Sequence, residues 1–323
     1  MLKLDLNEKP VKIAPGYDYA RKEDYARAKK AIANYAAVAP NNLLITNGSY
    51  HALDLIFSFL FREKEQILLP VPTFVFYDKF ELSRKLIFKK LPYSKSFSSQ
   101  TIIKHLKSGR NRGLYISNPN NPIGYAFSHS ELDSILLCAS RNKTLTIVDE
   151  AYFEFYGITI KSLIKKYPEL IILRTLSKAF GLAGARFGYV IAHEKMIEKL
   201  EKLKGPPYIV SHLALKAGID SLGRVGIKKM NQYVRENQRV RSELEIFLQK
   251  QKIEYFSSQT NFLTLGVNDT KKFFESLKRR NILLKDLADY PDGKNCLKSH
   301  VRVTIPPSNK LKLIKDSLNS LFP

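Results

Sequence analysis

The sequence predicts an α/β fold, with an α/β/α sandwich on a mostly parallel sheet of about seven strands and a smaller α+β domain after it. Short apolar runs recur along the first two thirds of the 323 residues, and segments with helical periodicity separate them. Several runs are apolar at every position, which is typical of strands buried on both faces. Strands that alternate with helices favour a parallel sheet covered by helices.

The elements follow in order along the chain. The expected strands of the sheet are residues 43–46, 67–69, 86–88, 114–116, 145–148, 170–173 and 187–191, and helices are expected at 50–61 and 130–140. After Gly205-Pro206-Pro207 come a long helical region, strand-like runs at 253–256, 262–265 and 301–305, and a helix at 271–280. We expect an arm and helix at 1–35 that pack with the small domain, a large domain at 36–208 and a small domain at 209–323.

Composition excludes several classes of protein. Hydrophobic residues make up 44% and charged residues 26%, as in ordinary globular proteins, so disorder and collagen-like structure are excluded. The formal charge is +23, from 53 Lys and Arg against 30 Asp and Glu. This excess suits a nucleic acid, an anionic membrane surface, acidic small molecules or simply a Lys-rich solvated surface, and we favour the last of these.

Targeting signals and metal motifs are not found in the sequence. The first residues lack the apolar core of a signal peptide, and no apolar run approaches the roughly 18 residues of a membrane helix. Two cysteines, Cys138 and Cys296, cannot form a zinc finger, and we expect free thiols. We therefore expect a cytoplasmic protein without a metal site and without a membrane partner.

Polar residues follow the strands where ligands bind in open α/β sheets, beyond the carboxyl ends. Gly48 and Ser49 follow the first strand and open a helix, whose N–H groups can hold an anion. Phe74 follows the second strand and can stack on a flat ring. Asn121 lies in a turn after the fourth strand, where its amide can face a ligand. Each feature taken alone also fits an ordinary turn or core residue.

A carboxylate and a lysine follow two further strands. Asp149 ends an apolar run and needs a cationic partner or strong donors, for which a structural salt bridge is the simpler explanation. Lys178 follows the next strand, and partial desolvation near other cations would make it nucleophilic. Arg186 offers a bidentate phosphate contact, which Thr175 and Ser177 can support with hydroxyl groups. The combination suits pyridoxal phosphate, which needs a Schiff-base lysine and an acidic partner for its ring nitrogen.

Three motifs carry a resemblance to a known family: Asn118 to Gly124 (Asn-Pro-Asn-Asn-Pro-Ile-Gly), Val148 to Tyr152 (Val-Asp-Glu-Ala-Tyr) and Thr175 to Arg186 (Thr-Leu-Ser-Lys-Ala-Phe-Gly-Leu-Ala-Gly-Ala-Arg). The chain resembles the fold-type I pyridoxal-phosphate enzymes of the class I/II aminotransferases, and within them the histidinol-phosphate aminotransferases. The arm motif Leu4 to Pro10 also matches that branch, and the resemblance covers nearly the whole chain.

The resemblance implies a role for each matching residue. Lys178 would form the Schiff base and move the proton, Asp149 would pair with the ring nitrogen, and Tyr152 and Asn121 would bond the ring hydroxyl. Phe74 would stack on the ring. The phosphate would be held by Gly48, Ser49, Tyr50, Thr175, Ser177 and Arg186, with Tyr19 (or Tyr17) reaching the partner's phosphate in a homodimer. Arg302, Asn121, Lys285 and Asn7 would bind substrate.

Three positions depart from the family pattern. Lys285 stands where histidinol-phosphate enzymes usually carry an arginine, which keeps the charge and loses the planar fork. Pro306 replaces a glycine, and His51 stands where an acidic residue is common. The resemblance implies an intact cofactor site and leaves the identity of the substrate open.

Three functions follow as hypotheses. The first is a ping-pong aminotransferase, for histidinol phosphate with 2-oxoglutarate or for an aromatic or other amino acid. The second is a decarboxylase of a phosphorylated amino acid, similar to threonine-phosphate decarboxylases. The third is a basic nucleic-acid-binding protein on a degenerate enzyme scaffold, which the intact Lys178 and Asp149 argue against. We therefore expect a small-molecule amino donor and acceptor, and no nucleic acid, as partners.

Overall fold

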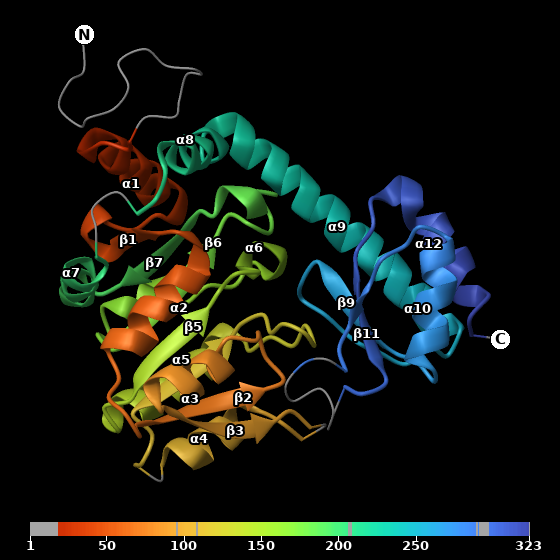
Figure 1. Cartoon of the computed structure of the whole chain (residues 1–323), viewed down its shortest axis with the longest axis horizontal. Coiled ribbons are helices and arrows are strands. Elements are labelled where there is room, and N and C mark those ends of the chain that lie inside the picture. The colour runs from red at the N-terminus through yellow and green to blue at the C-terminus, as the bar shows by residue number, and fades with distance from the viewer. Residues whose placement is uncertain are drawn as a thin grey trace.

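A seven-stranded sheet forms the centre of the structure, a computed structural model that describes residues 19–94, 96–107, 109–205, 209–288, 290 and 297–322 (Figure 1). Its spatial order is β1-β7-β6-β5-β4-β2-β3. The strands are β1 (Leu43–Thr46), β2 (Gln66–Val71), β3 (Ile87–Pro92), β4 (Gly113–Ser117), β5 (Leu145–Asp149), β6 (Leu170–Thr175) and β7 (Gly188–Ala192). Four pairs are parallel: β3 with β2, β2 with β4, β4 with β5, and β5 with β6. The strand β7 pairs antiparallel with β6 and with β1. The predicted seven strands and mostly parallel sheet are confirmed.

Alternate residues of each strand enter two different hydrophobic cores. In β5, Ile147 packs into one core and Val148 into the other. In β6, Leu173 and Ile172 divide in the same way. Because both faces of the sheet are covered, the strands need apolar residues at consecutive positions, and this explains the unbroken apolar runs in the sequence.

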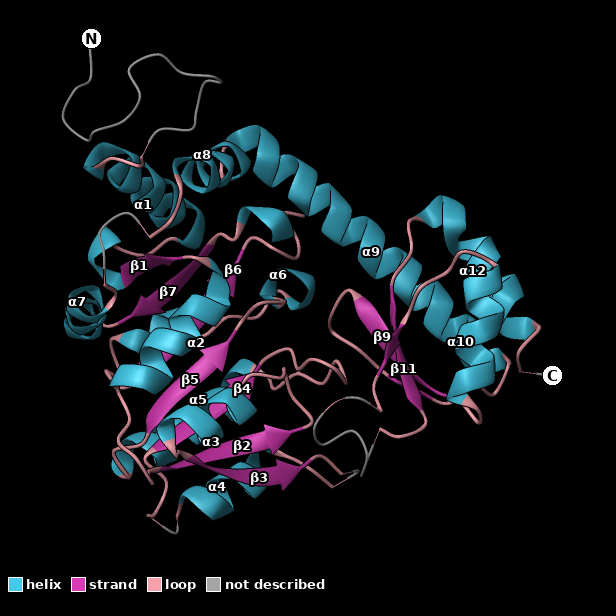
Figure 2. Ribbon diagram, in the orientation of Figure 1, coloured by secondary structure: helices cyan, strands magenta, loops and turns pink. Residues whose placement is uncertain are grey.

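Helices cover both faces of the sheet (Figure 2). One face packs against α2 (Gly48–Phe59), α3 (Tyr77–Arg84) and α7 (Glu194–Leu203). The other packs against α1 (Lys22–Ala36), α4 (Ser99–Leu106), α5 (His129–Arg141) and α8 (His212–Ser221). The short helical segments are α6 (Phe153–Tyr156), η1 (Pro40–Asn42), η2 (Lys161–Ile164) and η3 (Ala183–Ala185). The result is the predicted α/β/α sandwich.

A second, four-stranded sheet follows in the C-terminal part, with the order β10-β11-β9-β8. Its strands are β8 (Tyr255–Phe256), β9 (Phe262–Gly266), β10 (Lys285–Asp286) and β11 (His300–Thr304). The helices here are the C-terminal half of α9 (Arg224–Lys250), α10 (Thr270–Arg279) and α12 (Leu311–Asn319), with η4 (Ser308–Lys310). They enclose a separate core with Val240, Leu263 and Val301 at its centre. The predicted α+β unit is present, and β10, which is only two residues long, was not expected.

The structure differs from the expected domain division at its two boundaries. The helix α1 was expected to pack with the small domain, but Ala28, Ile32 and Ala33 lie in the core of the large sheet. The helix α8, which begins after residue 209, packs into the same core through Ala214 and Leu215. The two helices also pack against each other, and the C-terminal core begins only within α9.

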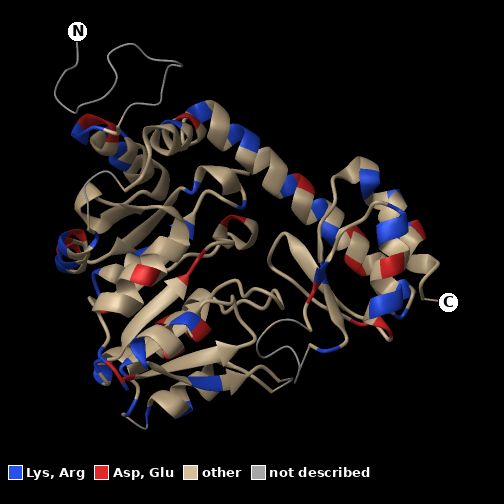
Figure 3. Cartoon of the chain, viewed as in Figure 1, with Lys and Arg blue, Asp and Glu red and all other residues tan. Residues whose placement is uncertain are grey.

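Basic residues are spread over the whole molecule. Lys and Arg occur on α1, α7, α9 and the C-terminal helices (Figure 3). Many of them form exposed ion pairs, such as Lys216 with Asp220 and Arg239 with Glu236. Among the described residues, no helix is both long and apolar enough to cross a membrane. This distribution fits the Lys-rich solvated surface that we favoured for the +23 charge.

The turn between β1 and α2 lies directly against β7. A Cβ atom added to Gly188 would lie 2.6 Å from the carbonyl carbon of Gly48 and 2.7 Å from the amide nitrogen of Ser49. Both contacts are to backbone atoms, which cannot rotate away as a side chain can. Gly48 itself has a φ of +76°, in the left-handed region that favours glycine. Two glycines therefore permit the position of the first turn of α2.

Replacing Gly188 tests this packing. We expect Gly188→Ala to lower the free energy of unfolding by about 1–3 kcal/mol, because the added methyl group overlaps the backbone. The matched control is Gly184→Ala, where an added Cβ meets no atom within 4 Å. Thermal unfolding of both variants measures the difference. Equal midpoints for the two variants would contradict the close approach.

Candidate active site

A cavity of about 250 Å³ lies at the carboxyl ends of β4, β5 and β6. Most of the residues singled out from the sequence as cofactor contacts line it. They are Ser49, Tyr50, Phe74, Asn121, Asp149, Tyr152, Thr175, Ser177, Lys178 and Arg186, and they are joined by Ser117, Ala151 and Ala183. Residues that are far apart in sequence meet here because parallel strands end at the same edge of the sheet.

Asp149 supplies a buried carboxylate at the end of β5. The hydroxyl group of Tyr115 donates to its Oδ2 at 2.9 Å, and the backbone N–H of Ala151 donates to its Oδ1 at 3.0 Å. Burial raises the pKa of Asp149, while these two hydrogen bonds and the positive charge of Lys178 lower it. The carboxylate is therefore held in one orientation, and a further cation in the cavity would stabilise its ionised form.

Lys178 supplies an amine in the same cavity. Its Nζ lies 5.4 Å from the ring centroid of Tyr152. Burial lowers the pKa of Lys178, and the positive charges of Arg302 and Arg186 lower it further, against the opposing effect of Asp149. A lowered pKa increases the fraction of neutral amine, which is the nucleophilic form.

Hydroxyl groups and a guanidinium group gather at the start of α2. Ser49 and Ser177 line the cavity with Arg186. The Oγ1 of Thr175 accepts from the backbone N–H of Ser177 at 3.1 Å and lies 2.9 Å from its Oγ. A Cβ atom on Gly48 would lie 2.7 Å from a terminal nitrogen of Arg186, so the guanidinium group rests on the first turn of the helix. Helix N–H groups, hydroxyl groups and a cation together form an anion site.

These groups fit pyridoxal phosphate. The anion site suits the phosphate, the Asp149 carboxylate suits a protonated ring nitrogen, and the Lys178 amine suits the aldehyde. Phe74, whose side chain is 37% exposed, lines the cavity beside Tyr50, with their ring centroids 6.5 Å apart. The chemistry of the donor set therefore matches each polar part of this cofactor.

A second cationic group reaches the cavity from the C-terminal sheet. The Nη1 of Arg302 donates to Oδ1 of Asn121 at 2.5 Å and to the hydroxyl group of Tyr290 at 3.2 Å. The guanidinium group lies 5.1 Å from the ring centroid of Phe262. Among the described residues, Arg302 has no carboxylate within ion-pair distance. Its remaining N–H groups are thus available to an anionic ligand.

Of the other predicted residues, Lys285 and Tyr19 lie outside the cavity lining, whereas Tyr152 lies within it. Lys285 on β10 is the direct cross-strand partner of Arg302 on β11, so the two side chains leave the same face of the sheet. Tyr19 lies just before α1 with 57% of its surface exposed. Asn7 and Tyr17 lie outside the described residues. Tyr152 is buried beside Phe262, at a ring distance of 5.4 Å, and burial raises its pKa to about 12.

Three groups in the site were missed from the sequence. Tyr115 orients Asp149 from the middle of β4. In the sequence this position lies within an apolar run and looks like that of an ordinary core residue. Tyr290 reaches Arg302 from a loop without any motif. Ser117 ends β4 and could have been found by the same rule that identified Asp149, since both follow the last apolar residue of a strand.

A buried ion pair supports the two central strands beneath the cavity. Arg174 donates from Nε and Nη2 to Oε2 of Glu150, at 2.9 Å and 2.8 Å. Both side chains are almost fully buried, with 2% and 1% of their surfaces exposed. Thr159 and the backbone N–H of Ile160 also donate to the Glu150 carboxylate. Because Glu150 follows Asp149 and Arg174 precedes Thr175, this pair fixes the ends of β5 and β6 relative to each other.

Comparison with known sequences gives a matching family model and relatives of about 30% identity. Residues 17–318 match the model of the family described as aminotransferase class I and II. A histidinol-phosphate aminotransferase of Thermoanaerobacter pseudethanolicus is 32% identical over 266 residues, which are 81% of this chain and 74% of the relative.

Solved structures show the same fold. The histidinol-phosphate aminotransferase of Clostridium acetobutylicum superposes with a TM-score of 0.84 at 25% identity, over 94% of this chain and 91% of that one. The L-threonine-O-3-phosphate decarboxylase of Porphyromonas gingivalis gives a TM-score of 0.77 at 21% identity, over 93% and 92% of the two chains. The second likeness shows the fold alone.

The hydrogen bond from Tyr115 to Asp149 can be tested by Tyr115→Phe. Because that bond lowers the pKa of Asp149, its loss should raise this pKa and leave less carboxylate ionised. We expect the affinity for pyridoxal phosphate to fall about tenfold, and to fall more at pH 6 than at pH 8. Tyr167→Phe removes a similar tyrosine–aspartate bond, to Asp133, away from the site and serves as the control. Equal affinity in both variants at both pH values would refute the role of Tyr115.

Proposed function

The chain belongs to the class I and II aminotransferase family, and on that premise we propose that it transfers an amino group between histidinol phosphate and 2-oxoglutarate by a ping-pong mechanism. Pyridoxal phosphate is its cofactor, as in the family. The observation that carries the proposal is the meeting of Lys178 and Asp149 at one edge of the large sheet, with Arg302 of the small sheet held against Asn121 of the same cavity. The name of the 32% identical relative supports this choice of substrate.

Pyridoxal phosphate, when bound, supplies an aromatic ring that takes up the electron pair released at the substrate Cα. Asp149 would keep the ring nitrogen protonated through its fixed carboxylate, and Tyr152 and Asn121 would bond the ring hydroxyl. Lys178 would hold the aldehyde in the resting enzyme, and once the substrate amine has displaced it, its freed Nζ would take the proton from the substrate Cα. The lowered pKa of Lys178 favours this role because the neutral amine can accept a proton.

Arg302 would bind the anionic group of the substrate. Asn121 and Tyr290 hold its guanidinium group in place and leave other N–H groups for the ligand. A carboxylate of 2-oxoglutarate and the phosphate of histidinol phosphate both accept two parallel hydrogen bonds from such a group. One cation can thus serve both halves of a ping-pong reaction.

Lys285 would hold a second oxygen of the substrate phosphate. It is the cross-strand partner of Arg302 and supplies a positive charge on the same face of the small sheet. The position in the family usually holds arginine, whose planar fork Lys285 lacks. A lysine attracts a phosphate as a point charge, so the change of residue keeps the attraction and relaxes the geometry.

We also propose that the protein is a cytoplasmic homodimer in which the exposed Tyr19 reaches the cofactor phosphate of the partner. Asn7, which lies outside the described residues, would contact substrate, as the resemblance implies. The scattered basic residues in Figure 3 support small anions rather than nucleic acid as the ligands.

A half-reaction screen tests the proposed reaction. The enzyme loaded with pyridoxal phosphate is mixed with a single amino donor, either histidinol phosphate, glutamate or an aromatic amino acid, and its absorbance reports conversion to the pyridoxamine form. We expect conversion by histidinol phosphate and by glutamate, and loss of at least about a thousandfold in rate for Lys178→Ala, which lacks the base. The exposed Lys165→Ala is the control. Absence of conversion with every donor would refute the aminotransferase.

The same screen separates the alternative activities. Faster conversion by an aromatic amino acid than by histidinol phosphate would indicate an aminotransferase whose amino donor is an aromatic amino acid. Release of carbon dioxide from O-phosphothreonine would indicate the decarboxylase. The arm motif around Asn7 favours the aminotransferase.

The phosphate contact of Lys285 has its own test. We expect Lys285→Ala to raise the KM for histidinol phosphate by about tenfold, because a charge-assisted contact is lost, and to change kcat little. Lys285→Arg should lower this KM below the wild-type value by restoring a bidentate contact. Lys278→Ala on α10 controls for the change of net charge. An unchanged KM in both Lys285 variants would show that Lys285 does not contact the substrate.

A further inference from the structure

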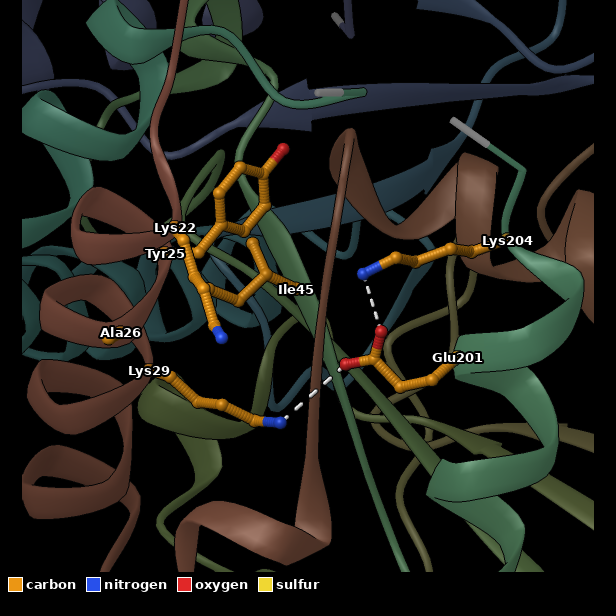
Figure 4. Close-up of a pocket in the computed structure, with 7 residues that line it drawn as sticks. All are labelled: Lys22, Tyr25, Ala26, Lys29, Ile45, Glu201 and Lys204. Atoms are coloured by element: carbon orange, nitrogen blue, oxygen red, sulfur yellow. Dashed lines mark ion pairs between the residues drawn. The ribbon is translucent and has the colours of Figure 1, made fainter. Parts of the chain in front are cut away.

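A second cavity lies away from the active site, at the terminal strand of the large sheet (Figure 4). Its volume is about 510 Å³. It is lined by α1, which covers one face of the sheet, by α7, which covers the other, and by Ile45 of β1. The cavity therefore lies along the edge of β1 that is opposite to β7.

Positive charge dominates the lining. Three lysines, Lys22, Lys29 and Lys204, face a single carboxylate, Glu201, which leaves a net charge of +2. Figure 4 shows the three amines directed into the same space from two different helices. The side chains of Lys29 and Lys204 are 28% and 18% exposed, so water only partly screens their repulsion.

The carboxylate is already engaged by two of the lysines. Glu201 lies 3.6 Å from Nζ of Lys29 with one oxygen and pairs with Lys204 through the other. This arrangement holds two amines at the wall of the cavity. It leaves Lys22 without a carboxylate partner among the described residues. An incoming anion would thus meet oriented cations and relieve the repulsion between them.

An apolar wall completes the cavity. The Tyr25 hydroxyl accepts from the backbone N–H of Val210 at 2.8 Å and donates to its carbonyl oxygen at 3.1 Å. These bonds hold the ring beside Ala26 and Ile45, and they engage the hydroxyl group both as a donor and as an acceptor. The ring itself remains as a flat apolar surface, with Lys204 5.8 Å from its centroid.

We propose that this cavity binds a small organic anion with two negative charges, whose charged group contacts the three lysines and whose apolar or aromatic part lies on Tyr25 and Ile45. The inference goes beyond the proposed reaction and holds whichever amino donor the enzyme uses. A phosphate monoester and a dicarboxylate share this chemistry, and both are tested below.

The cavity is electrostatically linked to the start of α2, which carries cofactor contacts. His51 follows Tyr50 in the first turns of this helix. Burial lowers the pKa of His51, Asp54 opposes this, and the positive charge of Lys204 lowers the pKa further. An anion beside Lys204 offsets that charge, so binding is expected to raise the pKa of His51.

Calorimetric titration of the enzyme loaded with pyridoxal phosphate tests the site, with phenyl phosphate, inorganic phosphate and phthalate as probes. A background that carries both Arg302→Gln and Lys285→Gln removes the two proposed substrate cations that could also bind them. We expect phenyl phosphate to bind more tightly than inorganic phosphate, because only the former covers the Tyr25 ring. Tighter binding of phthalate than of phenyl phosphate would identify a dicarboxylate as the natural ligand class.

Matched lysine variants distinguish the cavity from general attraction by net charge. Lys22→Gln and Lys29→Gln should each weaken binding of the tightest probe by at least about tenfold. Lys30→Gln, which removes an exposed charge next to Lys29 and outside the cavity, should change it by less than about twofold. Equal weakening in all three variants, or no binding of any probe, would overturn the proposal.

The His51 pKa provides a second readout that does not depend on activity. The C2 proton of His51 is titrated by NMR with and without a saturating probe. We expect a higher pKa in the complex, and also in the probe-free Lys204→Gln variant, where the charge that lowers the His51 pKa is absent. An unchanged His51 pKa in the otherwise unmodified enzyme would place the anion away from Lys204 and overturn the assignment.

Discussion

A carboxylate buried at the end of a central strand is the constraint around which the site is built. Asp149 follows four residues of β5, and its neighbouring strands on both sides are also buried. Such a group is destabilising unless donors and a cation surround it. Tyr115 and the N–H of Ala151 supply the donors. In the proposed function the protonated ring of the cofactor would be that cation, so burial of Asp149 and cofactor binding would be parts of one arrangement.

The rest of the large sheet holds this arrangement in register. The buried pair of Arg174 with Glu150 ties the ends of β5 and β6, from which Asp149 and Thr175 enter the cavity. On the other side, Gly188 lets the start of α2 lie on β7. The N–H groups at the start of α2 can therefore approach an anion that Arg186 also contacts. A methyl group at position 188 would push the start of α2 away from β7.

The substrate side of the cavity depends on the second sheet. Arg302 comes from β11, and its bond to Asn121 connects the two sheets directly across the site. Only a small fraction of the 53 basic residues takes part in this chemistry. Many of the others form exposed ion pairs at the surface, and the cavity at β1 is the one further place where we assign lysines to a ligand.

Sequence alone determined the seven strands, the position of Lys178 and Asp149 after two of them, and the cofactor. It could do so because buried strands require unbroken apolar runs and because ligands bind where parallel strands end. Only the tertiary structure decided that α1 packs on the large sheet, that Tyr115 orients Asp149, that Tyr290 contacts Arg302 and that Gly188 must lack a side chain. Each of these depends on which distant residues come into contact, and that is set by packing between elements rather than by any local pattern.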